Sequence, residues 1–169
     1  MLRLIVLGLA LPQLFAGATV VPLSRAELAA RSDTVVRARV LDQASLRSQK
    51  SGRILTVSRL QVLESYKGAA QKMLALEQLG GTLDGMTLVV PGDARVERGE
   101  EAVFFLRCAG KERCYLTGLG LGKFSVRTGR DGKRLAMREL RGLNDTSGRV
   151  LPDDSLPLEV LERELRSRP

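Results

Sequence analysis

The segment AVFFLRC, from Ala102 to Cys108, is the feature of this 169-residue chain that most constrains its fold. It is the most hydrophobic stretch outside the N-terminus and combines aromatic and β-branched residues, which favours a buried strand. We therefore expect a central strand with Phe104 and Leu106 on the core side. Cys114 follows after a glycine and three charged residues, which is typical of a turn, so a second strand is expected to begin at that cysteine.

The N-terminus has the pattern of a secretory signal. A short basic start, Met1-Leu2-Arg3, is followed by an apolar run from Leu4 to Phe15 and by the small residues Ala16-Gly17-Ala18. The run is shorter than the roughly 20 residues that span a bilayer, which favours a cleaved signal over an anchor. The sequence thus predicts a signal peptide over 1–18, a mature chain of 19–169 without a membrane span, and a periplasmic or secreted location.

Export has a consequence for the two cysteines of the chain. In an oxidising compartment, cysteines this close together usually form a disulfide, so Cys108 and Cys114 are expected to join the ends of two adjacent strands. A redox-active pair is the alternative, but the spacing is not the C-x-x-C of thiol oxidoreductases.

Most of the remaining chain shows β patterns separated by turn signals. Val36, Ala38 and Val40 alternate with Arg37 and Arg39, which predicts a strand with one face in water. A polar loop is expected over 43–53. Further strands are predicted at 54–66, 73–79, 86–90, 102–108, 114–127 and 134–140.

Two short helices are expected near the ends. Ser24 and Glu27 have the spacing of a capping box, which predicts a helix over 25–31. An amphipathic helix that packs on the domain is predicted over 157–167, with an apolar stripe of Leu158, Leu161 and Leu165. These elements predict a single, mostly β domain with its core over about 25–140, arranged as a small barrel or sandwich.

Four phrases of the chain resemble a known family. SDTVVRARV, RILTVSRLQVLESYKG, GEEAVFFLRC and CYLTG occur in the order found in netrin-like modules, the group that includes the tissue inhibitors of metalloproteinases and similar exported bacterial proteins. The matching residues are Asp33, Val35, Val40, Lys67, Gly68, Gly99, Glu100, Phe105 and Leu106. The resemblance implies an OB-like barrel of five to six strands. The inhibitors use an N-terminal Cys-x-Cys, which this chain lacks, so their mechanism is not implied.

The stretch GLGLGKFSV, from Gly118 to Val126, invites comparison with a phosphate-binding loop. Gly122-Lys123 precedes Phe124 instead of serine or threonine, and Thr117 stands where the first glycine should be. The alternate glycines instead predict a strand that bends sharply. On that interpretation Gly120 is needed for folding, and Lys123 is dispensable for stability.

Catalytic chemistry is not indicated by the composition. The chain has no histidine, which removes the side chain most used for proton transfer and zinc binding. Ser48, Lys50 and Ser51 lie together, but without a known nucleophile motif. We therefore expect no enzyme activity, no cofactor and no metal. A hydrolase that uses carboxylates remains one alternative, and an inhibitor of an exported hydrolase is another.

The mature chain is basic, with 26 Lys and Arg against 19 Asp and Glu, a net charge of +7. Such a balance favours anionic partners, although it also serves solubility. Four arginines on the predicted outward face of the first two strands are candidate binding residues: Arg37, Arg39, Arg53 and Arg59. Because aromatics are only 4% of the residues, a protein or an anionic glycan is favoured over nucleic acid. The predicted function is an exported module that binds a protein or an anionic envelope component.

Overall fold

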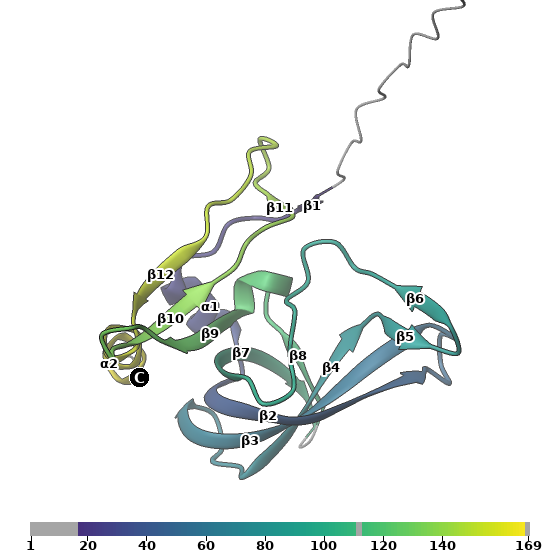
Figure 1. Cartoon of the computed structure of the whole chain (residues 1–169), viewed down its shortest axis with the longest axis horizontal. Helices are drawn as coiled ribbons and strands as arrows, with labels where there is room; N and C mark the ends of the chain where they lie inside the picture. Colours follow the sequence, from purple (N-terminus) through teal and green to yellow (C-terminus); the bar gives the residue numbers. More distant parts are fainter. Residues whose placement is uncertain (1–16, 111–112, 168–169) are drawn as a thin grey trace, which may run out of the picture.

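The computed structural model describes residues 17–110 and 113–167, and its main element is one eight-stranded sheet (Figure 1). The predicted mostly β fold is confirmed. Of the predicted signal peptide, residues 1–16 lie outside the described residues. In the part of the chain that is described, no helix is long and apolar enough to cross a bilayer.

The large sheet uses strands from most of the chain. In spatial order they are β12 (Asp154–Pro157), β10 (Arg134–Arg138), β9 (Lys123–Thr128), β7 (Glu101–Ala109), β2 (Thr34–Arg47), β3 (Ile54–Lys67), β4 (Met73–Leu79) and β8 (Arg113–Leu116). Two small sheets pair β1 (Ala18–Thr19) with β11 (Leu143–Asn144) and β5 (Gly81–Leu83) with β6 (Met86–Leu88).

Strand β7 is the branch point of the large sheet. One of its edges pairs with β2, and the other edge is shared: residues 102–104 pair with β9 and residues 106–109 pair with β8. Because β8 also pairs in parallel with β4, through Ala75 and Leu76, the pairings β2–β3–β4–β8–β7 return to β2. Strands β9, β10 and β12 continue the sheet away from this cycle. The sheet is therefore larger than the predicted five to six strands and is not a clean barrel.

Two hydrophobic cores lie on opposite faces of β7. Ala102, Phe104 and Leu106 belong to the core inside the cycle of strands. Val103 and Phe105 belong to a second core, which contains residues of α1 (Arg25–Arg31), α2 (Leu158–Arg166), β9 and β10. All five side chains are fully buried, so the predicted inward positions of Phe104 and Leu106 are confirmed. The intervening residues are equally buried because a second layer covers the other face.

Both predicted helices are present. Helix α1 begins at a complete capping box, in which Glu27 N–H donates to Ser24 Oγ (3.3 Å) and Ser24 N–H donates to the Glu27 carboxylate (2.9 Å). Helix α2 buries its leucine stripe, Leu158, Leu161 and Leu165, in the second core. Packing of these apolar faces is the main source of stability for helices this short.

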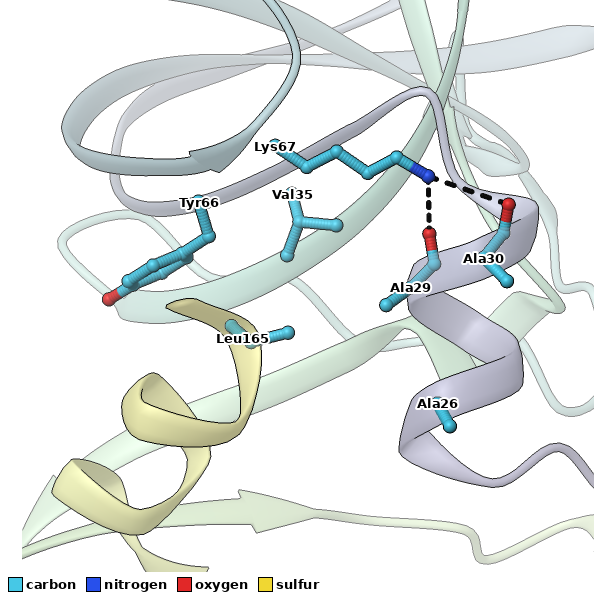
Figure 2. Close-up of a pocket in the computed structure, with 7 residues that line it drawn as sticks. All are labelled: Ala26, Ala29, Ala30, Val35, Tyr66, Lys67 and Leu165. Carbon is cyan, nitrogen blue, oxygen red and sulfur yellow. Dashed lines mark hydrogen bonds between the residues drawn. The ribbon is translucent and has the colours of Figure 1, made fainter. Parts of the chain in front are cut away.

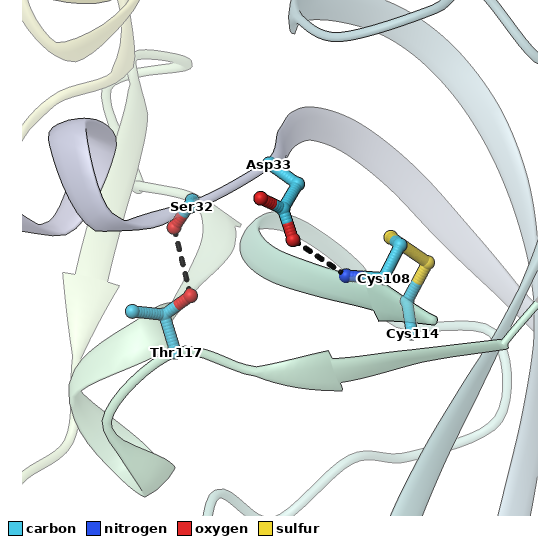
Figure 3. The surroundings of a disulfide bond; sticks show 5 residues. All are labelled: Ser32, Asp33, Cys108, Cys114 and Thr117. Atoms are coloured by element: carbon cyan, nitrogen blue, oxygen red, sulfur yellow. Dashed lines mark hydrogen bonds between the residues drawn. A yellow bond between two sulfur atoms is a disulfide. The ribbon is translucent and has the colours of Figure 1, made fainter. Parts of the chain in front are cut away.

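The predicted disulfide is confirmed, and it fastens the β7–β8 hairpin where α1 reaches it (Figure 3). Cys108 and Cys114 are directly opposite each other in the strand register. Beside them, the Cys108 N–H donates to Asp33 Oδ2 (3.0 Å), and the hydroxyls of Ser32 and Thr117 lie 2.8 Å apart. The end of α1 is thus tied to both strands of the bridged hairpin.

Two sequence-based expectations are corrected. The predicted loop over 43–53 is shorter than expected, because β2 continues to Arg47 and the turn is confined to 48–53. The glycines of GLGLGKFSV do not lie in a strand: Leu119–Gly122 forms a short 3-10 helix, and β9 begins only at Lys123. Gly118 has φ 73° and Leu119 has φ 57°, so this turn needs a left-handed backbone rather than the period of a strand.

Gly120→Val is expected to destabilise the protein by about 2 kcal/mol or more, because a Cβ at Gly120 would lie 2.8 Å from the carbonyl oxygen of Gly92. That carbonyl also accepts the Gly120 N–H at 2.9 Å, so neither backbone segment can move freely. The matched control is Gly129→Ala, where the nearest atom is the end of the exposed Asp131 side chain. Urea unfolding should separate the two variants; equal stabilities would contradict the close approach at Gly120.

Candidate binding surface

The structure places three of the four candidate arginines on the outer face of β2 and β3. Arg37 and Arg39 alternate with the buried Val36, Ala38 and Val40, and Arg59 lies between the buried Ser58 and Leu60. Side chains that alternate with buried ones along a strand point away from the core. Arg53 lies apart from them, in the turn between the two strands.

Arg37 is the centre of an ion-pair network and is not a free cation. Its Nη1 lies 2.7 Å from Glu101 Oε1, its Nη2 lies 3.0 Å from Glu64 Oε2, and its Nε lies 3.1 Å from Glu162 Oε1. Only 17% of its side chain is exposed. Since Glu162 belongs to α2, this arginine fastens the C-terminal helix to the sheet.

Neighbouring groups extend this network. The Tyr66 hydroxyl donates to Glu162 (2.6 Å), and burial together with this bond raises the pKa of Tyr66. The hydrogen bond from Arg166 is the main cause that lowers the pKa of Glu64. Burial acts to raise the pKa of Glu101, but hydrogen bonds from Arg37 and Arg134 outweigh it, so that pKa is lowered overall.

The other two arginines of this face also have acidic partners. Arg39 Nη2 lies 3.5 Å from Glu101, and Arg59 forms an ion pair with Asp42 on the facing strand. Both side chains stay more than half exposed. Positive and negative side chains therefore alternate on this face, and its net charge is smaller than the number of its arginines.

Cations without an ion-pair partner gather instead at the end of the β2–β3 hairpin, within the described residues. Residues 43–63 contain no aspartate or glutamate, and Arg47, Lys50 and Arg53 are all exposed there. Among the described residues, the side chains of these three form no ion pair, and Arg47 Nη1 donates a hydrogen bond to the Gly52 carbonyl (3.1 Å). We call Arg47, Lys50 and Arg53 the basic tip.

Two members of the basic tip are absent from the sequence-based candidates. Arg47 was expected in a loop, and Lys50 drew attention only as a possible partner for a nucleophilic serine. A usable signal was present, namely the long interval without acidic residues. That interval alone does not separate the basic tip from the paired arginines, because it also contains Arg59, which pairs with Asp42 across the hairpin.

An open groove of about 520 Å³ lies where the β5–β6 hairpin meets β2, β3 and β4. Its floor includes Gln43, Thr56 and Gln78, whose side chains point to the inner face of the sheet, and its other wall includes Val89 and Asp93. Burial raises the pKa of Asp93. The groove is open to solvent, and its lining mixes these polar side chains with apolar ones such as Leu88 and Val96.

A smaller cavity of about 190 Å³ lies between the two helices and the ends of β2 and β3 (Figure 2). Its lining is aliphatic except for Tyr66 and Lys67. Both polar groups are engaged: the Tyr66 hydroxyl donates to Glu162, and Lys67 Nζ donates to the Ala29 carbonyl at the end of α1 (2.7 Å). A ligand pocket normally offers free polar groups that orient its ligand, and here both serve the helices instead.

A buried serine–lysine pair bears on the hydrolase alternative. Lys123 Nζ lies 2.7 Å from Glu100 Oε1, and Ser125 Oγ donates to the same carboxylate (2.6 Å). All three residues are less than 10% exposed. A serine nucleophile needs a free base and space for an acyl group. Here the lysine is paired with an acid, and the adjacent cavity of about 20 Å³ has room for about one water molecule.

This cluster corrects the expectation that Lys123 is dispensable. Lys123 and Ser125 are two residues apart in β9, so they share one face of the strand. The lysine also donates to the Arg95 carbonyl, which fixes the segment before β7. The identity of the partner, Glu100, could not be read from sequence spacing because it comes from a different part of the chain.

Comparisons with known proteins add no family. No protein-family model matches the chain, and no curated protein gives a significant match. Within residues 17–110 and 113–167, no cluster of three or more potential metal ligands occurs.

Lys123→Ala is expected to lower the free energy of unfolding by about 3–5 kcal/mol, because it leaves the Glu100 carboxylate buried without its cation. Lys133→Ala is the control: its pair with Asp131 is exposed, so a change below about 1 kcal/mol is expected. Urea unfolding measures both. A double variant, Lys123→Met with Glu100→Gln, should recover part of the loss, and no recovery would contradict the electrostatic explanation.

Acid is expected to loosen the attachment of α2. Glu64 and Glu101 have lowered pKa values in the folded state, so they stabilise it above their unfolded pKa near 4.3, and this contribution is lost as the pH falls through the folded values. The melting temperature should stay nearly level from pH 8 to about 5 and then fall. Arg37→Gln should be less stable at pH 7 and lose less on acidification; parallel curves for the two proteins would contradict this role.

Proposed function

We propose that the protein is an exported, non-enzymatic binding module that contacts an anionic component of the cell envelope through the basic tip. The observation that carries this proposal is the exposure of Arg47, Lys50 and Arg53 in a stretch without acidic residues. Arg37, Arg39 and Arg59 of the neighbouring sheet face are paired with carboxylates, so the basic tip supplies the unpaired cations of this hairpin. Concentrated positive charge attracts anionic surfaces more strongly than the same charge spread over the molecule.

The strand order supports this choice of site. We propose that β2, β3, β4, β7 and β8 form an OB-like barrel, since they pair in a cycle and the β4–β8 pair is parallel. OB folds commonly bind ligands on the face of their second and third strands and on the loop between the first two. In this chain those parts are β3, β4 and the β2–β3 turn with the basic tip. The netrin-like resemblance agrees with this proposal and is the sole basis of the alternative function, inhibition of an exported hydrolase.

The positions of the aromatic residues favour a polyanion that has no nucleobases, such as a lipid headgroup or a glycan, over a nucleic acid. Phe104, Phe105 and Phe124 are fully buried, and residues 43–63 contain no aromatic side chain. Single-stranded nucleic acids are usually held by stacking on exposed aromatics beside a basic groove. Phosphate or carboxylate groups on a lipid or glycan need only the cations. The disulfide agrees with an oxidising location outside the cytoplasm, where such envelope components occur.

The basic tip is tested with heparin as a soluble polyanion and with the mature chain, residues 19–169. Arg47→Gln/Lys50→Gln/Arg53→Gln should weaken binding about 100-fold at low salt, since each cation near an anionic surface contributes about 1 kcal/mol. The slope of log affinity against log salt should also become shallower.

The matched control is Arg127→Gln/Arg130→Gln/Lys133→Gln, which removes the same charge from the exposed β9–β10 turn. It should retain affinity within about threefold, because distant charges are screened at ordinary salt. Equal losses in the two triple variants would show that net charge alone attracts the polyanion, and the proposed site would be wrong.

A further inference from the structure

We infer that the anionic partner of the basic tip is a lipid surface, into which neighbouring apolar side chains insert. This inference rests on the proposed function, because it names the partner of the same site. Its basis is a group of exposed apolar residues that a soluble polyanion would leave in water. Leu46 is 42% exposed, Met86 is 51% exposed and Val89 is 74% exposed.

These apolar residues lie on two hairpins that are joined next to the basic tip. Leu46 is the neighbour of Arg47 and lies opposite Leu55 in the register of β2 and β3. Met86 begins β6, and Val89 follows its end. We call Leu46, Met86 and Val89 the apolar rim.

Hydrogen bonds hold the two hairpins together. Gly80 N–H donates to the Ile54 carbonyl (2.8 Å), and Thr56 Oγ1 donates to the Gly80 carbonyl (2.8 Å). The chain that enters the β5–β6 hairpin therefore lies against the first residues of β3. Figure 1 shows both hairpins at the same end of the molecule, away from α1 and α2. The apolar rim and the basic tip thus belong to one end of the protein.

The chemistry of this end fits a lipid surface. Cations attract anionic headgroups, and apolar side chains gain when they leave water for the acyl boundary just below. A soluble sulfated or carboxylated glycan would use the cations alone. A protein partner would favour aromatic anchors at the centre of the contact, and neither 43–63 nor 80–90 contains an aromatic residue.

Insertion can be observed directly, because the chain contains no tryptophan. Met86→Trp places a single tryptophan, which can be excited apart from the tyrosines, in the apolar rim. Val150→Trp places one at a valine that is 69% exposed near the small β1–β11 sheet. With vesicles of phosphatidylcholine and phosphatidylglycerol, the emission of Met86→Trp should shift to the blue by about 10 nm or more, since apolar surroundings replace water. The emission of Val150→Trp should not shift.

Binding of the mature chain is then compared across two probes, the anionic vesicles and heparin. Leu46→Ser/Met86→Ser/Val89→Ser should lose at least tenfold in vesicle partitioning and keep its affinity for heparin. Val21→Ser/Val150→Ser removes exposed apolar surface elsewhere and should change neither. Circular dichroism confirms that each variant is folded.

The outcomes separate this inference from the proposed function. Loss of vesicle binding alone in the apolar-rim variant, with a blue shift at Met86→Trp, supports a lipid partner. A second outcome is that binding to heparin and to vesicles depends equally on the basic tip while the apolar-rim variant binds both normally. In that case the partner is a soluble polyanion and the lipid inference is wrong. If the wild-type mature chain binds neither probe, the proposed function itself is wrong.

Discussion

The arrangement of the molecule depends on the burial of both faces of β7. This strand carries Ala102, Phe104 and Leu106 on one face and Val103 and Phe105 on the other. A single covering layer would bury one face and leave the other in water. The cycle of β2, β3, β4 and β8 covers one face, and the two helices with β9 and β10 cover the other. The edge of β7 that does not pair with β2 is divided accordingly: β8 belongs to the cycle, and β9 belongs to the second layer.

Local signals in the sequence were sufficient for much of this fold. The capping box gave α1, the leucine stripe gave α2, and the cysteine spacing gave the bridged hairpin, because each depends on residues close together in the chain. The second core could not be predicted in this way. The run of buried residues in AVFFL fits either a half-buried or a fully buried strand, and only the packing partners, such as Phe124 and Leu161, decide between them.

Charges show the same division between local and tertiary information. Arg37, Arg39 and Arg59 lie on an outer face, as expected. Glu64 and Asp42 are their partners within β2 and β3, but Glu101 and Glu162 come from distant segments, so the full network could not be inferred from this hairpin. The basic tip escaped notice for the opposite reason. It is defined by the absence of acidic residues between 43 and 63, whereas a basic site is more easily recognised from a dense run of lysine and arginine.

The length of β2 connects the core to the proposed binding surface. Val36, Ala38 and Val40 in its first half belong to the core inside the cycle of strands, and an irregularity in the register follows between Val40 and Asp42. Beyond it, β2 and β3 extend as a hairpin whose inner face carries Gln43, Ser45 and Thr56 and is covered by the start of the β5–β6 hairpin. The strand therefore needs no apolar side chains for a core there, which leaves its end free to carry exposed cations and Leu46. The hydrogen bonds of Gln43, Ser45 and Thr56 hold this end in place, so its exposed residues are not needed for packing.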